Sequence, residues 1–123
     1  MELPYNADAE KQVLANMIFS SDMLVETFSR LSADDFYLKE HQIIFKTLKT
    51  IFDNNKAKVE PYALIDKLSI DGNLDKVGDA SYILELMSSY IDIANATYYI
   101  NSVEEKAILR KLINTWFTRP FIN

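Results

Sequence analysis

The sequence predicts an all-α protein, a compact bundle of about six helices. Only two glycines, Gly72 and Gly78, and three prolines, Pro4, Pro61 and Pro120, punctuate its 123 residues. The long segments between them repeat apolar residues every three or four positions, which is typical of helices with one buried face. Because 49% of the residues are hydrophobic, the chain is also able to bury one packed core.

Two short amphipathic helices are predicted first. Asn6 is a good N-cap for the first helix, and Asp8 and Glu10 lie in the first turn, where negative charge favours the helix dipole. The apolar positions of its predicted buried face are Val13, Leu14, Met17 and Ile18. Ser20, Ser21 and Asp22 end this helix and can cap the second. The buried stripe of the second helix comprises Leu24, Phe28 and Leu31.

A polar turn over residues 32–37 follows these helices. Its adjacent carboxylates, Asp34 and Asp35, are expected to point in different directions. We expect one of them to bind backbone amides at the start of the next helical segment. Phe36 then anchors the turn in the core.

The clearest helical pattern covers residues 38–54. Its apolar residues recur at intervals of three and four: Ile44, Phe45, Leu48, Ile51 and Phe52. His41, the only histidine, falls one turn earlier, on or near the buried face. Since the chain has no cysteine and no second histidine, His41 is not half of a zinc site, and it lacks an evident nucleophile to activate. We interpret it as a structural histidine.

Three further helices are predicted in the second half of the chain. Pro61 suits the first turn of one, and Gly72 ends it in a left-handed conformation. Another begins near Asp79, and the last runs from about Asn95 to Trp116. The apolar residues of the last helix spread around more of its circumference than one core face requires. This surplus predicts contact with a partner helix or another subunit.

The charge balance argues against a nucleic-acid-binding surface. The net charge is −5 and the sequence pI is near 4.8, whereas nucleic-acid binding depends on clustered Lys and Arg. The densest basic stretch, Lys106 with Arg110 and Lys111, is interpreted as part of a mixed solvated helix face. A phosphate-binding loop is not expected, because Gly78 is followed by the carboxylate of Asp79.

The composition also bears on compartment. The N-terminal residues resemble no signal peptide, and no apolar run approaches the roughly 20 residues that span a bilayer. We therefore expect a cytoplasmic protein with no membrane association, no cofactor and no metal.

Four collinear segments resemble the N-terminal domain of DnaB-type replicative DNA helicases. They are residues 6–14, residues 35–45 with Asp35-Phe36-Tyr37 and His41, residues 74–86 with Val77-Gly78 and Ser81-Tyr82, and residues 95–113 with Val103-Glu104-Glu105-Lys106 and Leu109-Arg110-Lys111. The resemblance divides the chain into a head, residues 4–114, and a divergent tail, residues 115–123. The family usually has a second glycine where Asp79 stands. Pro120 stops helix propagation, so the last long helix is expected to start an incomplete helical hairpin.

The resemblance implies a role in protein interaction. In the family, the hairpin pairs neighbouring subunits of a hexameric ring, and in bacteria the head receives the C-terminal helicase-binding domain of the DnaG-type primase. The ATPase domain lies elsewhere in these proteins, so no catalytic, cofactor-binding or metal-binding residue is expected here. Tyr82 and Ile113 match positions on the family's primase-facing surface and are the predicted partner contacts.

Two other classes of function remain as alternatives. Short helices also build small DNA-binding regulators, although the acidic balance disfavours that reading. A small hydrolase using Asp34, Asp35 and His41 is the weaker alternative, because neither a nucleophile nor a phosphate loop accompanies them. The sequence favours a non-catalytic interaction domain.

Overall fold

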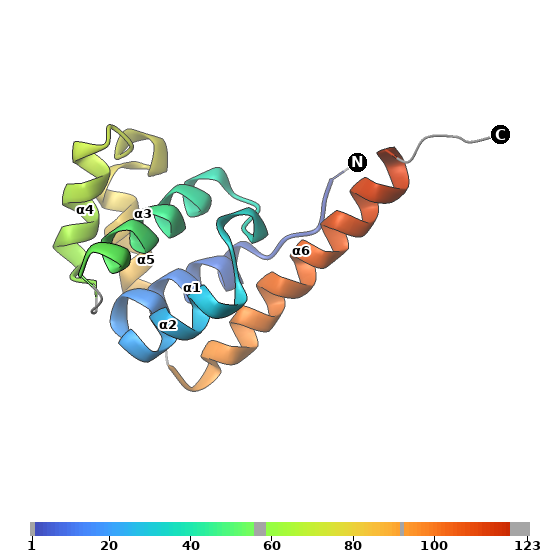
Figure 1. Ribbon diagram of the computed structural model, residues 1–123, viewed down its shortest axis with the longest axis horizontal. Coiled ribbons are helices and arrows are strands. Elements are labelled where there is room, and N and C mark those ends of the chain that lie inside the picture. The colour runs from blue at the N-terminus through green and yellow to red at the C-terminus, as the bar shows by residue number, and fades with distance from the viewer. Residues whose placement is uncertain (1, 56–58, 92, 119–123) are drawn as a thin grey trace.

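The computed structural model describes residues 2–55, 59–91 and 93–118. It contains six α-helices and three 3-10 turns, in the order α1 (Ala7–Phe19), α2 (Ser21–Arg30), η1 (Ala33–Asp35), α3 (Lys39–Asn55), α4 (Pro61–Ile70), η2 (Asp75–Val77), α5 (Asp79–Ser88), η3 (Ile93–Asn95) and α6 (Ala96–Thr118). No strand occurs among the described residues. The predicted all-α class and bundle of about six helices are confirmed (Figure 1).

Helix α1 is the centre of the head. It packs against α2, α3, α5 and α6, so its side chains are buried on nearly every side. The buried set includes three polar residues: Glu10, Gln12 and Asn16. The prediction of an amphipathic first helix with one buried face was therefore wrong. Its apolar positions were identified correctly, but the opposite face meets α6 and α5 instead of water.

The predicted helix ends are confirmed at several caps. The Asn6 side chain accepts a hydrogen bond from the Ala9 amide at 3.0 Å, and the Ser20 hydroxyl accepts one from the Met23 amide at 3.2 Å. Pro61 is the first residue of α4, and Gly72, after its end, has a φ of 72°. The Asn6 and Ser20 side chains thus accept hydrogen bonds from amides that have no partner within their helix. Gly72 provides the left-handed conformation that follows the end of α4.

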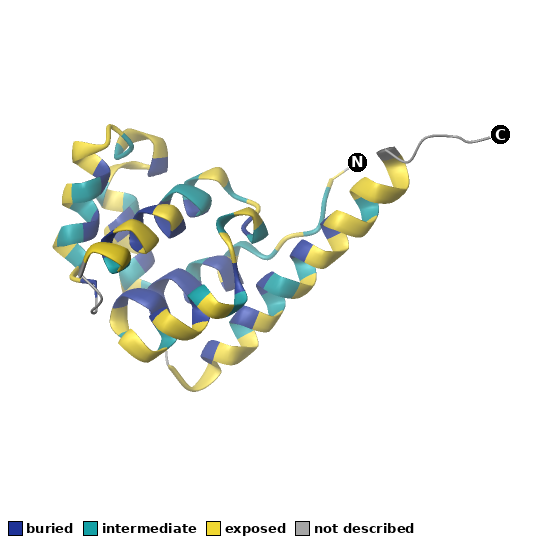
Figure 2. Cartoon of the chain, in the orientation of Figure 1, coloured by how far each residue is buried: buried dark blue, intermediate teal, exposed yellow. Residues whose placement is uncertain are grey.

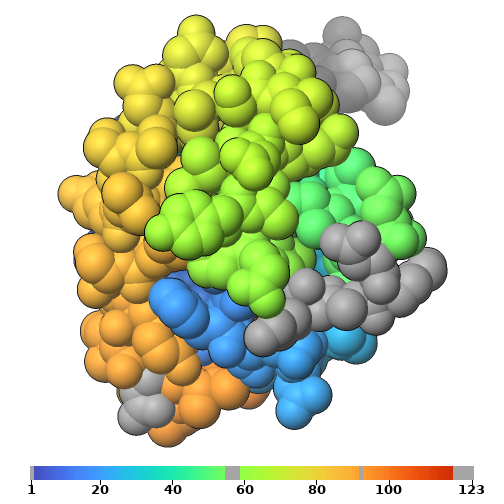
Figure 3. Space-filling model, turned by 90° about the vertical axis from the view of Figure 1, so that its left-hand side faces the viewer, coloured from blue at the N-terminus to red at the C-terminus, as the bar shows by residue number. Residues whose placement is uncertain are grey.

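Helices α4 and α5 complete one side of the head. Helix α4 packs on α3, and α5 packs on α1. Leu64, Leu68, Ile83 and Leu86 are the fully buried residues of this side. Figure 3 looks onto it, and the C-terminal half of α6 is not visible from there.

Helix α6 is the longest helix, and only its first part belongs to the head. Ile100, Val103 and Ala107 are buried against the bundle, whereas the C-terminal turns project away from it and are mostly exposed (Figure 2). The helix spans 96–118, close to the predicted 95–116, so residues 115–118 of the predicted tail are helical. Pro120 and the rest of that tail lie outside the described residues. The division of the chain after residue 114 stays a prediction.

None of the helices in the described part combines the length and apolar character that a membrane crossing requires.

Candidate interaction surface

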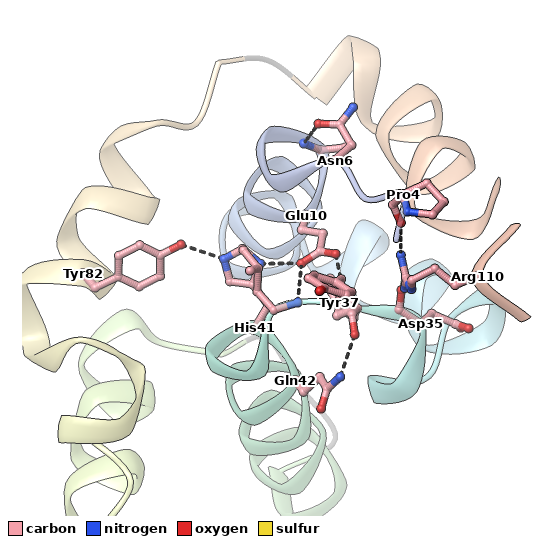
Figure 4. Close-up of polar contacts among 12 residues, drawn as sticks. Pro4, Asn6, Glu10, Asp35, Tyr37, His41, Gln42, Tyr82 and Arg110 are labelled. Carbon is pink, nitrogen blue, oxygen red and sulfur yellow. Dashed lines mark hydrogen bonds and ion pairs between the residues drawn. The ribbon is translucent and has the colours of Figure 1, made fainter. Parts of the chain in front are cut away.

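A buried polar cluster joins α1, α3 and α5 behind the surface of the head. Glu10 Oε1 lies 2.7 Å from His41 Nδ1, and His41 Nε2 lies 2.6 Å from the Tyr82 hydroxyl (Figure 4). Glu10 is 2% exposed and His41 is 0% exposed. Both ring nitrogens of His41 are therefore occupied by protein partners, as expected of a histidine that holds elements together.

Glu10 also receives the backbone that leads into α3. Its Oε2 accepts a hydrogen bond from the Tyr37 amide at 2.7 Å, and its Oε1 accepts a longer one from the Leu38 amide at 3.4 Å. The carboxylate thus satisfies donors just before α3 that would otherwise be unpaired. The expectation that Glu10 only favours the dipole of its own helix missed this role, because its partners come from a distant segment.

The expected role of Asp34 and Asp35 is corrected at the same place. Asp35 Oδ2 accepts a hydrogen bond from the Ser32 amide at 2.8 Å, which closes a capping box within η1 instead of binding the start of α3. Phe36, as predicted, is fully buried and anchors the turn in the core. The hydrogen-bond partners of His41 are Glu10 and Tyr82, so the structure does not assemble a site from His41 and the paired aspartates.

Arg110 ties the end of the head together. Its guanidinium donates to the Pro4 carbonyl at 2.9 Å and to the Asp35 carbonyl at 2.7 Å (Figure 4). It also lies 5.4 Å from the centre of the Tyr37 ring, which stacks on Tyr5 with ring centres 4.4 Å apart. With 7% exposure, Arg110 is not part of a solvated face, so that expectation was wrong.

Tyr82 lies at the edge of this cluster and is partly buried. Its hydroxyl faces His41, and the Lys11 ammonium lies 5.8 Å from the centre of its ring. Burial raises the pKa of Tyr82 to about 12, and the negative charges of Glu40, Glu85 and Glu10 add to the shift. The polar end of this predicted partner contact is thus engaged inside the domain, and only the rest of the ring is available to another protein.

The exposed side of α6 is a second candidate surface. Its apolar residues form what we call the α6 outer stripe: Ile108, Leu109, Leu112 and Trp116. The stripe lies opposite the face that carries Val103, Ala107 and Arg110 toward the bundle. Leu112 is 61% exposed and Trp116 is 69% exposed, a degree that is unusual for a contiguous set of large apolar side chains.

Ile113, the second predicted contact, is half-buried beside this stripe. Tyr82 is on α5 and Ile113 is on the projecting part of α6, and Figure 1 shows these elements on opposite sides of the molecule. The structure therefore does not bring the two predicted contacts into one compact patch.

In the described part of the chain, no group of three His, Asp or Glu residues is placed to hold a metal ion.

Two side chains that organise the site were not predicted from the sequence, Glu10 and Arg110. Helix α1 is buried on nearly every side, and a carboxylate in such a helix requires hydrogen-bond partners. Burial of the whole helix is therefore the feature that would have pointed to a structural role for Glu10.

Comparisons with known proteins agree on one family. A family model described as the DnaB-like helicase N terminal domain matches residues 2–105. The replicative DNA helicase DnaB of Leifsonia xyli subsp. xyli (strain CTCB07) is 31% identical over 110 residues, which are 89% of this chain and 24% of that protein. The replicative DNA helicase DnaC of Bacillus subtilis (strain 168) is 34% identical over 112 residues, which are 91% of this chain and 24% of that protein.

A solved structure shows the same fold. The crystal structure of the N-terminal domain of DnaB helicase from Mycobacterium tuberculosis superposes with a TM-score of 0.87 and 30% sequence identity, covering 95% of this chain and 81% of that one. The chain spans about a quarter of the length of the helicases named above, in agreement with a match to one domain. The family model, the related sequences and the shared fold together place this chain in the DnaB-like helicase N-terminal domain family.

Proposed function

We propose that this chain is a non-catalytic protein-interaction domain of a bacterial replicative DNA helicase. In this role it docks the C-terminal helicase-binding domain of a DnaG-type primase and contributes to assembly of the hexameric ring during DNA replication. The observation that carries the proposal is the α6 outer stripe, a set of large apolar side chains that are exposed in the described part of the domain.

The geometry of the stripe suits a partner helix. Leu109, Leu112 and Trp116 follow one another at intervals of three and four residues, the spacing with which helices pair side by side. The helix projects from the head, so a partner can approach the stripe without displacing core residues (Figure 2). This geometry supports self-association through α6, which is the assembly half of the proposal.

Charge favours a protein partner over nucleic acid. Lys49 and Lys67 form ion pairs one turn away along their own helices, with Asp53 at 3.0 Å and Asp71 at 3.1 Å. Arg110 is buried and bonded to backbone carbonyls. The net charge of −5 also disfavours binding to a phosphate backbone.

For the primase half of the proposal, we assign Tyr82 and Ile113 as contacts. Each presents part of an apolar side chain at the surface while the remainder is held by the domain. Such pre-ordered side chains lose little conformational entropy on binding, which is a property of interface anchors. The distance between α5 and the end of α6 then requires a partner that covers two faces.

Self-association is tested by light scattering of the purified chain over a concentration series. We expect Leu112→Asp to abolish any concentration-dependent rise in mass, because it introduces a charge into the middle of the stripe. Ile70→Asp is the matched control, since Ile70 is 79% exposed on α4, away from α6. A rise in mass that Leu112→Asp leaves intact argues against assembly through α6.

Primase docking is tested separately by titrating the helicase-binding domain of a cognate primase into the chain. Ile113→Ala is expected to weaken binding by roughly tenfold, as for an interface anchor, whereas Ile70→Ala leaves it unchanged. Tyr82→Ala also removes the bond to His41, so Tyr82→Phe serves as its control: it keeps the ring and removes only the hydroxyl. A chain that folds but binds no primase domain refutes the docking half of the proposal.

A further inference from the structure

A groove lies between α2, η1 and α3, on elements that the proposed α6, Tyr82 and Ile113 contacts do not use. Its volume is about 480 Å³. The floor is apolar and comprises Phe28, Leu31 and Phe45, and the rim includes Lys46, Lys49 and Thr50. The Phe28 side chain of α2 reaches the rings of Phe45 and Phe52 on α3, and the η1 segment connects the two helices along the chain.

The floor is held in place by aromatic packing. The Phe28 ring lies 5.4 Å from Phe45, edge to face, and 5.4 Å from Phe52. Phe45 in turn packs on buried Phe36 at 5.2 Å. Because these rings fix one another, the groove is pre-formed and does not need to open for a ligand.

The rim is positively charged, unlike the domain as a whole. The Lys49 ammonium lies 5.0 Å from the centre of the Phe28 ring and is paired with Asp53. Lys46 is exposed and forms no ion pair within the described ranges of the chain. It also borders a neighbouring hollow lined by Lys76 and Asp71. Among the described residues that line the groove none is acidic, although the protein has a net charge of −5.

An apolar floor beside an unneutralised lysine defines the chemistry of the occupant. The floor requires an aromatic or aliphatic side chain, and Lys46 requires a carboxylate at its edge. The volume suits one or two side chains, too little for a track of stacked bases, and two lysines are few for a nucleic-acid site. An acidic peptide meets both requirements. It carries fewer negative charges than a nucleic acid, so the acidic surface of the domain repels it less.

We infer that the α2–α3 groove binds a short segment of another protein in which an aromatic or aliphatic side chain is flanked by Asp or Glu. The apolar side chain enters between Phe28 and Phe45, and the carboxylates meet Lys46 and Lys49. This interaction is independent of primase docking and of assembly through α6, because it involves none of their residues.

The test uses a display library of random peptides, selected on the intact chain and synthesised after selection. We expect the selected peptides to be enriched in Asp or Glu next to Trp, Phe or Leu. Lys46→Glu is expected to weaken their binding by about tenfold or more in fluorescence anisotropy, and added salt weakens binding to the native chain. Thr50→Trp, which fills the groove from its rim, is expected to weaken it similarly without altering the net charge.

Lys39→Glu is the matched control, since it makes the same charge change on the same helix outside the groove. Peptides without the acidic and apolar pattern, or peptides whose binding withstands both Lys46→Glu and Thr50→Trp, overturn the inference. Equal weakening by Lys39→Glu also overturns it, because that result indicates general charge attraction. Binding of oligothymidylate at this groove, lost in Lys46→Glu, assigns the groove to single-stranded nucleic acid instead.

Discussion

Gly78 and Asp79 place two consecutive residues in the left-handed region, with φ values of 93° and 64°. Glycine adopts this conformation without steric cost. Asp79 adopts it at a lower cost than most other residues, because its short polar side chain can hydrogen-bond locally. The family resemblance noted in the sequence, in which a second glycine usually occupies this position, now has a physical reason. The two residues turn the chain from η2 into α5 and thereby orient Tyr82.

The conformation of Gly78 predicts a steric effect on Tyr82. A Cβ at Gly78 would lie 2.9 Å from Tyr82 Cβ, while one at Gly72 would meet nothing within 4 Å. We expect Gly78→Ala to lower the free energy of unfolding by about 2–3 kcal/mol, from backbone strain plus overpacking. Gly72→Ala, with backbone strain alone, is expected to cost about 1 kcal/mol. Urea denaturation measures both, and equal losses would contradict a contact with Tyr82.

The raised pKa of Tyr82 predicts that the folded domain loses stability at high pH. Its pKa rises from 10.0 to about 12 in the folded protein, chiefly because burial disfavours the phenolate. The folded state therefore holds the phenolic proton more tightly than the unfolded chain does. This contribution to stability is complete below pH 10 and is lost as the pH rises through 12.

The measurement compares the native chain with Tyr82→Phe. The difference between their free energies of unfolding is expected to be constant below pH 10 and to change in favour of Tyr82→Phe between pH 10 and 12. Urea denaturation at a series of pH values provides the comparison. A difference that stays constant to pH 12 would show that the Tyr82 hydroxyl is not protected in the folded state.

At the scale of elements, the predictable features are those with local causes. The caps at Asn6 and Ser20 bond amides three residues away, so a short stretch of sequence contains both donor and acceptor. Glu10 meets Tyr37 across 27 positions, and Arg110 meets Asp35 across 75. No local pattern distinguishes these two from ordinary charged residues on a helix face. Helix positions were thus readable, whereas the polar contacts that lock the helices together were not.

The role of Arg110 between elements predicts a large effect of its removal. Arg110→Met leaves the Pro4 and Asp35 carbonyls without their charged donor, and we expect a loss of about 2–4 kcal/mol in the free energy of unfolding. Arg30→Met is the matched control. Arg30 meets Asn101 and Glu104 at a partly exposed site, so its loss is expected to cost about 1 kcal/mol or less. Similar losses in thermal or urea unfolding would contradict a structural role for Arg110.

At the scale of the whole molecule, the domain combines an acidic surface with one apolar projection. Its net charge of −5 makes copies repel one another, while the α6 outer stripe favours their association. Self-association through the stripe is therefore opposed by a long-range force that salt screens.

This opposition predicts the direction of the salt dependence. Raising the ionic strength from about 0.05 M to about 0.5 M is expected to strengthen self-association, because it weakens the repulsion and leaves burial of the apolar stripe intact. Sedimentation equilibrium at several salt concentrations measures the dissociation constant. Weaker association at high salt would indicate that ion pairs, and not the stripe, hold the copies together.

The Arg110 bond to the Pro4 carbonyl joins residues 106 positions apart, so the first and the last parts of the domain meet in one contact. During synthesis on the ribosome, the early helices are available long before α6 emerges. Contacts of such high sequence separation form late, since they pay the entropy of closing a long loop before they gain anything from it. The nascent head must therefore wait with α1 uncovered on the side where α6 will pack, and its completion coincides with the arrival of the helix that bears the interaction stripe.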